Sequence, residues 1–209
     1  MKKTLLLFIF LAAAFTLVSA QSRETVGIHN LTGVDVEYLF IRQAGAASWD
    51  TEYLEGGDLK NGDSITYFGV PANRANSFDI LLIDKNLAVY AKTNVRGGPD
   101  RMIEFSSADS SGDFMRSSVN LMNLTGHVIW YVYISPSFSD TWGFDRLDSD
   151  QIIEHGKSAT VPLPIPVAVY NEYDILLEDS EGNTYSRFSV KMTSEEQNAF
   201  LFESKDMDG

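Results

Sequence analysis

The amino-acid sequence contains an internal duplication, which constrains the fold more than any other feature. Residues 30–54 (NLTGVDVEYLFIRQAGAASWDTEYL) align without a gap with residues 123–147 (NLTGHVIWYVYISPSFSDTWGFDRL), 93 positions later. The similarity continues, because residues 78–82 (FDILL) correspond to residues 173–177 (YDILL). A unit of about 90 residues is too long for a solenoid repeat and has the length of a small domain.

A polar segment separates the two copies. Residues 106–118 (SSADSSGDFMRSS) are rich in Ser, Asp and Gly, as is typical of a solvated linker. We therefore predict two tandem domains, with residues 21–112 as the first repeat and residues 113–209 as the second repeat. One larger sandwich built from both halves is the alternative.

Both repeats have the residue pattern of an all-β fold. Short segments rich in Val, Ile, Tyr, Phe and Thr alternate with turn signals, and no window of a dozen residues keeps a helical period. We expect two antiparallel, Ig-like β-sandwiches with helical turns only near residues 49–54 and 142–147. In the second repeat the strands are expected near residues 118–123, 127–135, 158–165, 172–178, 184–191 and 198–203.

Alternation within the second strand of each repeat predicts which side chains enter the core. The apolar set expected to point inward is Val36, Tyr38 and Phe40 in the first repeat, and Ile129, Tyr131 and Tyr133 in the second. Trp130 replaces the outward Glu37, which makes the second copy apolar on both faces. We therefore expect Trp130 to be buried against the other domain. An aromatic patch that faces a ligand is the alternative.

Three alternating prolines mark an edge strand in the second repeat. Pro162, Pro164 and Pro166 lie in the run VPLPIPV, and in an extended strand their missing N–H groups would all lie along one side. That side cannot pair with a neighbouring strand, so the sequence predicts an edge protected against aggregation.

The first twenty residues have the features of a cleavable signal peptide. Lys2 and Lys3 precede an apolar run, and small residues end at Ala20, where cleavage is expected. This pattern predicts a periplasmic or secreted protein that does not insert into the membrane after cleavage. The chain has no cysteine, so the exported protein must fold without disulfides.

The charge balance disfavours some classes of partner. The formal net charge is −13, and loss of Lys2 and Lys3 would make it more negative by two. A polyanion repels phosphate backbones and anionic headgroups, so nucleic acid and membrane surfaces are unfavourable partners. A protein or glycan of the cell envelope remains a possible partner, and the surplus acid could attract Ca²⁺.

The loop after the second strand carries the candidate site residues. Trp49 and Trp142 could stack on a sugar ring, or each could plug the open end of its own sandwich, which is the favoured interpretation. Carboxylates in this loop are weak candidates for binding Ca²⁺, with Arg146 as a competing ion-pair partner. The tentative ligand-binding set is Trp130, Trp142, Asp145 and Arg146, and the weak metal candidates are Asp140, Asp145, Asp148 and Asp150.

Other polar residues indicate structural roles. Asp79 and Asp174 share a place inside an otherwise apolar strand, where each is expected to accept hydrogen bonds from a nearby loop or an arginine. The three histidines are not duplicated, and no catalytic triad spacing or phosphate-binding glycine loop is present. We therefore expect no catalytic residues and no cofactor.

The motif at residues 135–147, SPSFSDTWGFDRL, followed by the YDI segment at Tyr173, resembles a group of small exported bacterial proteins with N-x-T-G, SPS and WGxD motifs. The resemblance covers nearly all of the second repeat and brings no catalytic residue with it. The first repeat departs from it, because Arg42-Gln43-Ala44 replaces SPS and Asp50 replaces the glycine.

Together these features favour an exported binding protein or structural module that has no catalytic activity. Its expected ligand is a protein, a glycan or another envelope component. The alternatives are a hydrolase with an unrecognised site and a Ca²⁺-dependent binding protein.

Overall fold

The computed structural model describes residues 22–49, 51–72, 75–114, 116–193 and 198–208. The expected signal peptide lies outside these residues. The described residues form an all-β protein with four three-stranded sheets and two short 3₁₀ turns, η1 (Ser107–Asp109) and η2 (Ser204–Asp206). Within them, no helix is long and apolar enough to cross a membrane.

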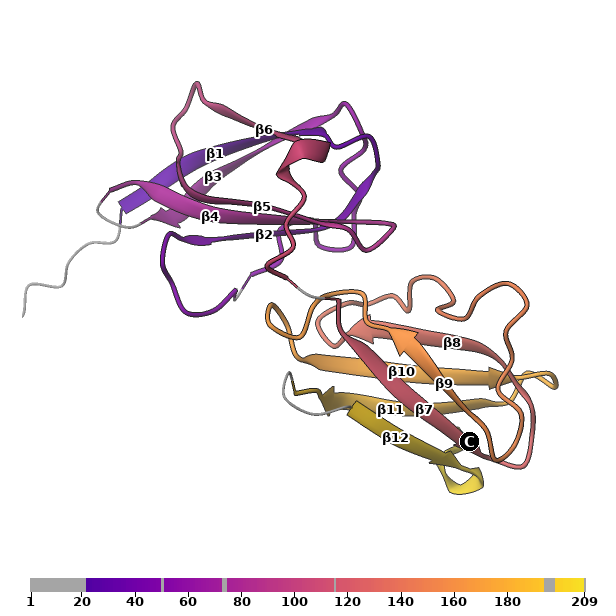
Figure 1. Ribbon diagram of the computed structural model, residues 1–209. Helices are drawn as coiled ribbons and strands as arrows, with labels where there is room; N and C mark the ends of the chain where they lie inside the picture. The colour runs from indigo at the N-terminus through magenta and orange to yellow at the C-terminus, as the bar shows by residue number, and fades with distance from the viewer. Residues whose placement is uncertain (1–21, 50, 73–74, 115, 194–197, 209) are drawn as a thin grey trace, which may run out of the picture.

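Each repeat contributes two of the sheets, drawn at the upper left and lower right of Figure 1. The sheet orders are β3-β1-β6 and β2-β4-β5 in the first repeat, and β12-β7-β9 and β11-β10-β8 in the second. The strands of the first repeat are β1 (Ser22–Leu31), β2 (Val36–Gln43), β3 (Ser64–Ala72), β4 (Ser77–Asp84), β5 (Val89–Arg96) and β6 (Met102–Ser106). Those of the second are β7 (Ser118–Leu124), β8 (Ile129–Pro136), β9 (Ser158–Pro162), β10 (Glu172–Asp179), β11 (Thr184–Lys191) and β12 (Asn198–Glu203).

The strands expected in the second repeat are confirmed, with shifts of at most three residues at their ends. Two details differ from the sequence expectations. One pair in each repeat is parallel rather than antiparallel, namely β1 with β6 and β7 with β12. The short helices expected near residues 49–54 and 142–147 do not form among the described residues. Both segments instead make a single bridge to the adjacent strand, Phe40 with Glu52 and Tyr133 with Asp145.

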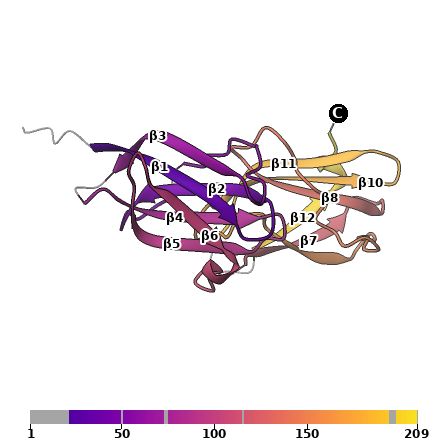
Figure 2. The ribbon, with the colours of Figure 1, turned by 90° about the horizontal axis from the view of Figure 1, so that it is seen from above.

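Each repeat has its own hydrophobic core between its two sheets. In the first repeat Ile28, Leu39, Ile80 and Phe105 belong to one buried cluster. In the second repeat Leu121, Val132, Ile175 and Phe202 form the equivalent cluster. Because each cluster draws on both sheets of its own repeat, the packing follows the duplication seen in the sequence. Figure 2 shows the two halves in line.

Val36 and Ile129 enter the cores as expected, but the rest of the second strand of each repeat faces the opposite way from the sequence expectation. Leu39 and Ile41 enter the core of the first repeat, whereas Tyr38 and Phe40 point away from it. The cause is a bulge, because Val36 pairs with Asp84 and Tyr38 with Ile83, which leaves Glu37 unpaired between them. An extra residue reverses the alternation for the rest of the strand.

An equivalent bulge in the second repeat explains why Trp130 is not buried against the other repeat. Ile129 pairs with Asp179 and Tyr131 with Glu178, so Trp130 occupies the unpaired position. Its side chain is 47% exposed, and Tyr131 beside it is 42% exposed. The expectation that Trp130 is buried between the repeats was therefore wrong.

The sheet that is covered twice belongs to the first repeat. All eight residues of β4 are buried, and its outward side chains form a third apolar cluster with residues of the second repeat. This shared cluster contains Tyr38, Phe40, Trp49, Leu81, Ile83 and Val89 from the first repeat, and Ile165 and Val169 from the second, with Phe114 and Tyr170 packed against it.

The proline-rich segment of the second repeat provides this cover. β9 is an edge strand as expected, but it ends at Pro162. Beyond it the buried apolar side chains divide between two clusters: Leu163 and Val167 enter the core of the second repeat, and Ile165 and Val169 enter the shared cluster. Pro164 and Pro166 are buried here, and because they lack N–H groups they bring no unsatisfied donor into the contact.

Leu81 and Leu176 offer a matched test of this double cover. Leu81 pairs with Phe40 on β2, and Leu176 pairs with Tyr133 at the equivalent place on β8. Leu81 is fully buried, whereas Leu176 is half-buried. In chemical denaturation we expect Leu81→Ala to lower the free energy of unfolding by about 2–5 kcal/mol, the range for buried Leu. We expect Leu176→Ala to lower it by about 1 kcal/mol. Equal losses would contradict the double cover.

Candidate functional site

A cleft of about 460 Å³ lies where the two repeats meet. This volume is within the usual range for small-molecule sites, which often form at domain interfaces. The lining residues come from both repeats: Tyr38, Phe40, Trp49, Thr51, Glu52, Glu55 and Gly56 from the first, and Phe138, Ser139, Asp140, Thr141 and Tyr170 from the second.

Trp49 forms part of the wall contributed by the first repeat. Its side chain is 6% exposed and packs edge-on against Phe114, which lies between η1 and β7. The Arg42 guanidinium lies 4.0 Å from the centre of the Trp49 ring and also forms a salt bridge with Asp79. Trp49 therefore does not plug the end of its own sandwich. It packs in the cluster that both repeats share.

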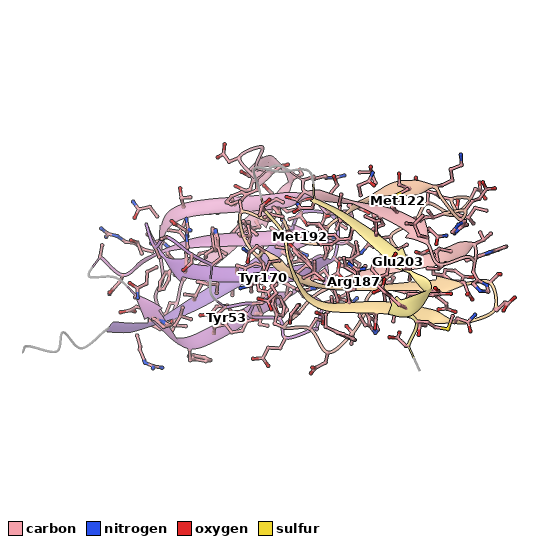
Figure 3. All side chains as sticks on the ribbon, turned by 90° about the horizontal axis from the view of Figure 1, so that it is seen from below. Tyr53, Met122, Tyr170, Arg187, Met192 and Glu203 are labelled. Atoms are coloured by element: carbon pink, nitrogen blue, oxygen red, sulfur yellow. The ribbon has the colours of Figure 1, made fainter. Side chains whose placement is uncertain are left out.

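Phe138 and Tyr170 form the aromatic part of the opposite wall. Their rings meet edge-on with 4.9 Å between centroids, and Phe138 is 42% exposed. Tyr170 lies in the middle of the molecule, between the strands of the two repeats (Figure 3). The hydroxyl of buried Tyr173 fixes the adjacent backbone, because it donates to the carbonyls of Ile165 and Tyr170.

Glu52 contributes a carboxylate whose position is fixed by the backbone. Its Oε1 accepts hydrogen bonds from the N–H groups of Leu39 and Leu54, and its Oε2 accepts one from Glu55. Burial raises the pKa of Glu52 above its usual value, although these hydrogen bonds oppose the shift. This side chain therefore serves to hold the loop against β2.

Two further cleft carboxylates have no such partners. Glu55 belongs to the first repeat and Asp140 to the second, and both are exposed. The side chains of Glu55 and Asp140 form no hydrogen bond or ion pair with any described residue. The cleft therefore carries one unpaired carboxylate from each repeat.

Two oppositely charged side chains, Glu37 of the first repeat and Arg146 of the second, act on Tyr38. Burial raises the pKa of Glu37, and the positive charge of Arg146 from the second repeat opposes this shift. Burial and the negative charge of Glu37 also raise the pKa of Tyr38. Glu37 Oε2 and Arg146 Nε and Nη2 are buried without a hydrogen-bond partner. Arg146, one of the expected ligand-binding residues, thus lies at the repeat junction.

The other expected ligand-binding residues are not brought together in the cleft. Asp145 Oδ1 accepts the N–H groups of Val132 and Leu147, as Glu52 does at the equivalent place in the first repeat. Trp142 is half-buried and packs against Phe188, with 5.9 Å between ring centroids. Trp130 lines a separate surface hollow with Tyr131 and Ile152.

The four weak metal candidates are also divided between places. Asp140 lines the cleft, whereas Asp145, Asp148 and Asp150 line the hollow beside Trp130. Within the described ranges, no group of three or more Asp, Glu and His side chains is arranged to hold a metal ion.

The N-x-T-G motif of each repeat is a buried structural turn. Asn30 Nδ2 donates to the carbonyls of Val34 and Leu59, and its Oδ1 accepts from the backbone and hydroxyl of Thr32. Asn123 makes the same set of hydrogen bonds with His127, Ile153 and Thr125. The duplication of this motif therefore reflects the fold rather than a ligand site.

The aspartates in the fourth strand of each repeat accept hydrogen bonds from loop residues, as the sequence predicted, and also from the neighbouring strand. Asp79 accepts from the N–H groups of Gly45 and Asn94 and from Arg42. Asp174 accepts from Ser137 Oγ and from the N–H of Ser189. Asn94 and Ser189 both have φ of 53°, so in each repeat the carboxylate stabilises a backbone position in the left-handed region.

The outer sheet face of the second repeat remains open. Its aromatic members include Tyr131 and Tyr133, whose rings stack with centroids 6.4 Å apart. Two positions that lie in the shared cluster in the first repeat are polar in the second: Ile83 and Val89 correspond to Glu178 and Thr184. This change fits a face that contacts water.

Several cleft residues were not singled out from the sequence. Phe138, Tyr170 and Glu55 lie in loops and become neighbours through the contact between the repeats. The available signal was the run ILLI at residues 80–83 of β4, since a strand with apolar side chains on both faces requires cover on both sides. No protein-family model, no curated protein and no solved structure matches the chain.

The pH dependence of stability can test the hydrogen bonds that the Asp179 carboxylate accepts. Burial would raise its pKa, but hydrogen bonds from Asn183, Glu181 and Tyr185 hold the pKa below the usual 3.8. His127 Nδ1 lies 3.7 Å from the same carboxylate. A carboxylate with a lowered pKa stabilises the fold above pH 3.8, and this contribution is lost as the pH falls through the folded-state pKa.

We therefore expect Asp179→Asn to lower the free energy of unfolding at pH 5 by about 1–3 kcal/mol, the cost of losing a charged buried acceptor. The difference between the wild type and the variant should become smaller between pH 5 and pH 2. Urea denaturation across this range checks the result. A difference that stays constant with pH would show that the Asp179 charge contributes nothing.

Proposed function

We propose that this chain is an exported, non-catalytic binding protein whose ligand occupies the cleft between the two repeats. Each repeat would act as an Ig-like β-sandwich domain, and neither would form the site alone. The observation that carries the proposal is that both repeats supply aromatic and acidic side chains to one cleft of ligand-binding size.

The structural roles of the polar residues outside the cleft support the proposal that the cleft binds a ligand. Asp79, Asp84, Asp145 and Asp179 accept hydrogen bonds that hold loops in place. His155 Nδ1 accepts the N–H of Gly126. These groups serve the fold, whereas Glu55 and Asp140 in the cleft have no such partner among the described residues.

The shape of the cleft favours it over the open face of the second repeat. A ligand in the cleft would contact two walls, whereas the open face offers one. The cleft walls are also held by the shared apolar cluster, so they are organised before a ligand arrives. Preorganised walls reduce the entropic cost of binding.

Filling the cleft tests this proposal. Thr141 lines the cleft and is exposed, so Thr141→Trp should occupy the space without disturbing the core. Thr160→Trp, on the exposed side of β9, is the matched control. We expect a thermal-shift screen of amines, peptides and glycans to reveal ligands that raise the Tm of the wild type and the control. The same ligands should not raise the Tm of Thr141→Trp.

Ligands that stabilise Thr141→Trp as well as they stabilise the wild type would place binding elsewhere. Conversion of a bound compound into products would contradict the non-catalytic role.

A further inference from the structure

The cleft combines aromatic rings with negative charge. Five of its lining residues are aromatic and three carry carboxylates, whereas none of its lining residues is Lys, Arg or His: the aromatic set is Tyr38, Phe40, Trp49, Phe138 and Tyr170, and the acidic set is Glu52, Glu55 and Asp140. The ring faces and the carboxylates both attract positive charge.

Elsewhere in the described structure, some aromatic rings have a cation of the protein beside them. Lys92 lies over Phe105 and is paired with Asp109, and Arg187 lies over Phe202 and is paired with Asp206. These two arrangements occupy equivalent places in the two repeats. They show that this fold uses a cation between a ring and a carboxylate as a stabilising unit.

In the cleft the rings and carboxylates are present without the cation. Arg42 does cover one side of Trp49 and is held by Asp79, and the charge of Arg146 acts on Tyr38, but neither arginine lines the cleft. Phe138 and Tyr170 have no cation over their rings among the described contacts. Glu55 and Asp140, on opposite walls, have no ion-pair partner there either.

We infer that the cleft takes an organic cation, with the apolar body against the accessible rings of Phe138 and Tyr170 and the ammonium or guanidinium group between Glu55 and Asp140. This inference rests on the proposed function and adds the chemical class of the ligand. The cation can belong to a free amine or to a Lys or Arg side chain of a peptide. A neutral sugar fits less well, because Tyr38, Phe40 and Trp49 are at most 9% exposed and offer no open ring platform.

Isothermal titration with two pairs of probes tests the ligand class. The small pair is 2-phenylethylammonium and the neutral 2-phenylethanol. The peptide pair is a short lysine peptide and the same peptide with acetylated lysines. We expect at least one cationic probe to bind, and its neutral counterpart to bind about tenfold more weakly or not at all. Binding by the small amine or by the peptide distinguishes the two sources of the cation.

Two double variants separate the local effect from the overall charge. Glu55→Gln with Asp140→Asn removes both cleft charges, and Asp63→Asn with Glu154→Gln removes two exposed charges outside the cleft. Both double variants change the net charge equally. We expect the first to weaken binding of the cationic probe about tenfold or more, and the second to weaken it less than twofold at 0.15 M salt, where distant charges are screened.

Equal weakening by both double variants would mean that the whole polyanion attracts the probe, which overturns the inference. Equal binding of the charged and neutral probes would overturn the cation class but leave a binding cleft in place. Absence of binding by all four probes also overturns the class. In that case the cleft-filling experiment with Thr141→Trp still decides the proposed function independently.

Discussion

The burial of one sheet face by a segment of the other repeat is the contact on which the rest of the structure depends. Apolar side chains on the outer face of β2, β4 and β5 would otherwise face water, and Ile165 and Val169 cover them. Burial of apolar surface is the main favourable contribution to domain association. The same contact brings Tyr170 and Phe138 opposite Tyr38 and Trp49. The cleft is therefore a consequence of how the two cores are joined.

The duplication explains why the two repeats share hydrogen-bonding side chains but differ in their outer sheet faces. Side chains that satisfy the backbone are shared by both copies, such as the buried Asn30 with Asn123 and the half-buried Glu52 with Asp145. The outer sheet faces have diverged, because one is covered by protein and the other contacts water. At equivalent positions Tyr38 is 9% exposed and Tyr131 is 42% exposed.

Much of the fold could be predicted from the sequence, because strand residues and turn signals are local. The duplication, the strand positions and the loop-binding role of Asp79 and Asp174 all followed from short patterns. The facing of β2 and β8 could not be predicted this way, since one bulged residue, Glu37 or Trp130, reverses the alternation. The cleft also escaped prediction, because Glu55 and Asp140 become neighbours only through the contact between repeats. The proline run misled for a similar reason: Pro164 and Pro166 lie in a buried contact rather than along a strand edge.

Differential scanning calorimetry of residues 21–209 tests most directly whether the shared cluster joins the two repeats into one cooperative unit. If each repeat depends on this contact, the chain should unfold in a single transition, with equal calorimetric and van't Hoff enthalpies. Two separate transitions, each with the enthalpy of about 90 residues, would show that the repeats are independent and that their contact contributes little.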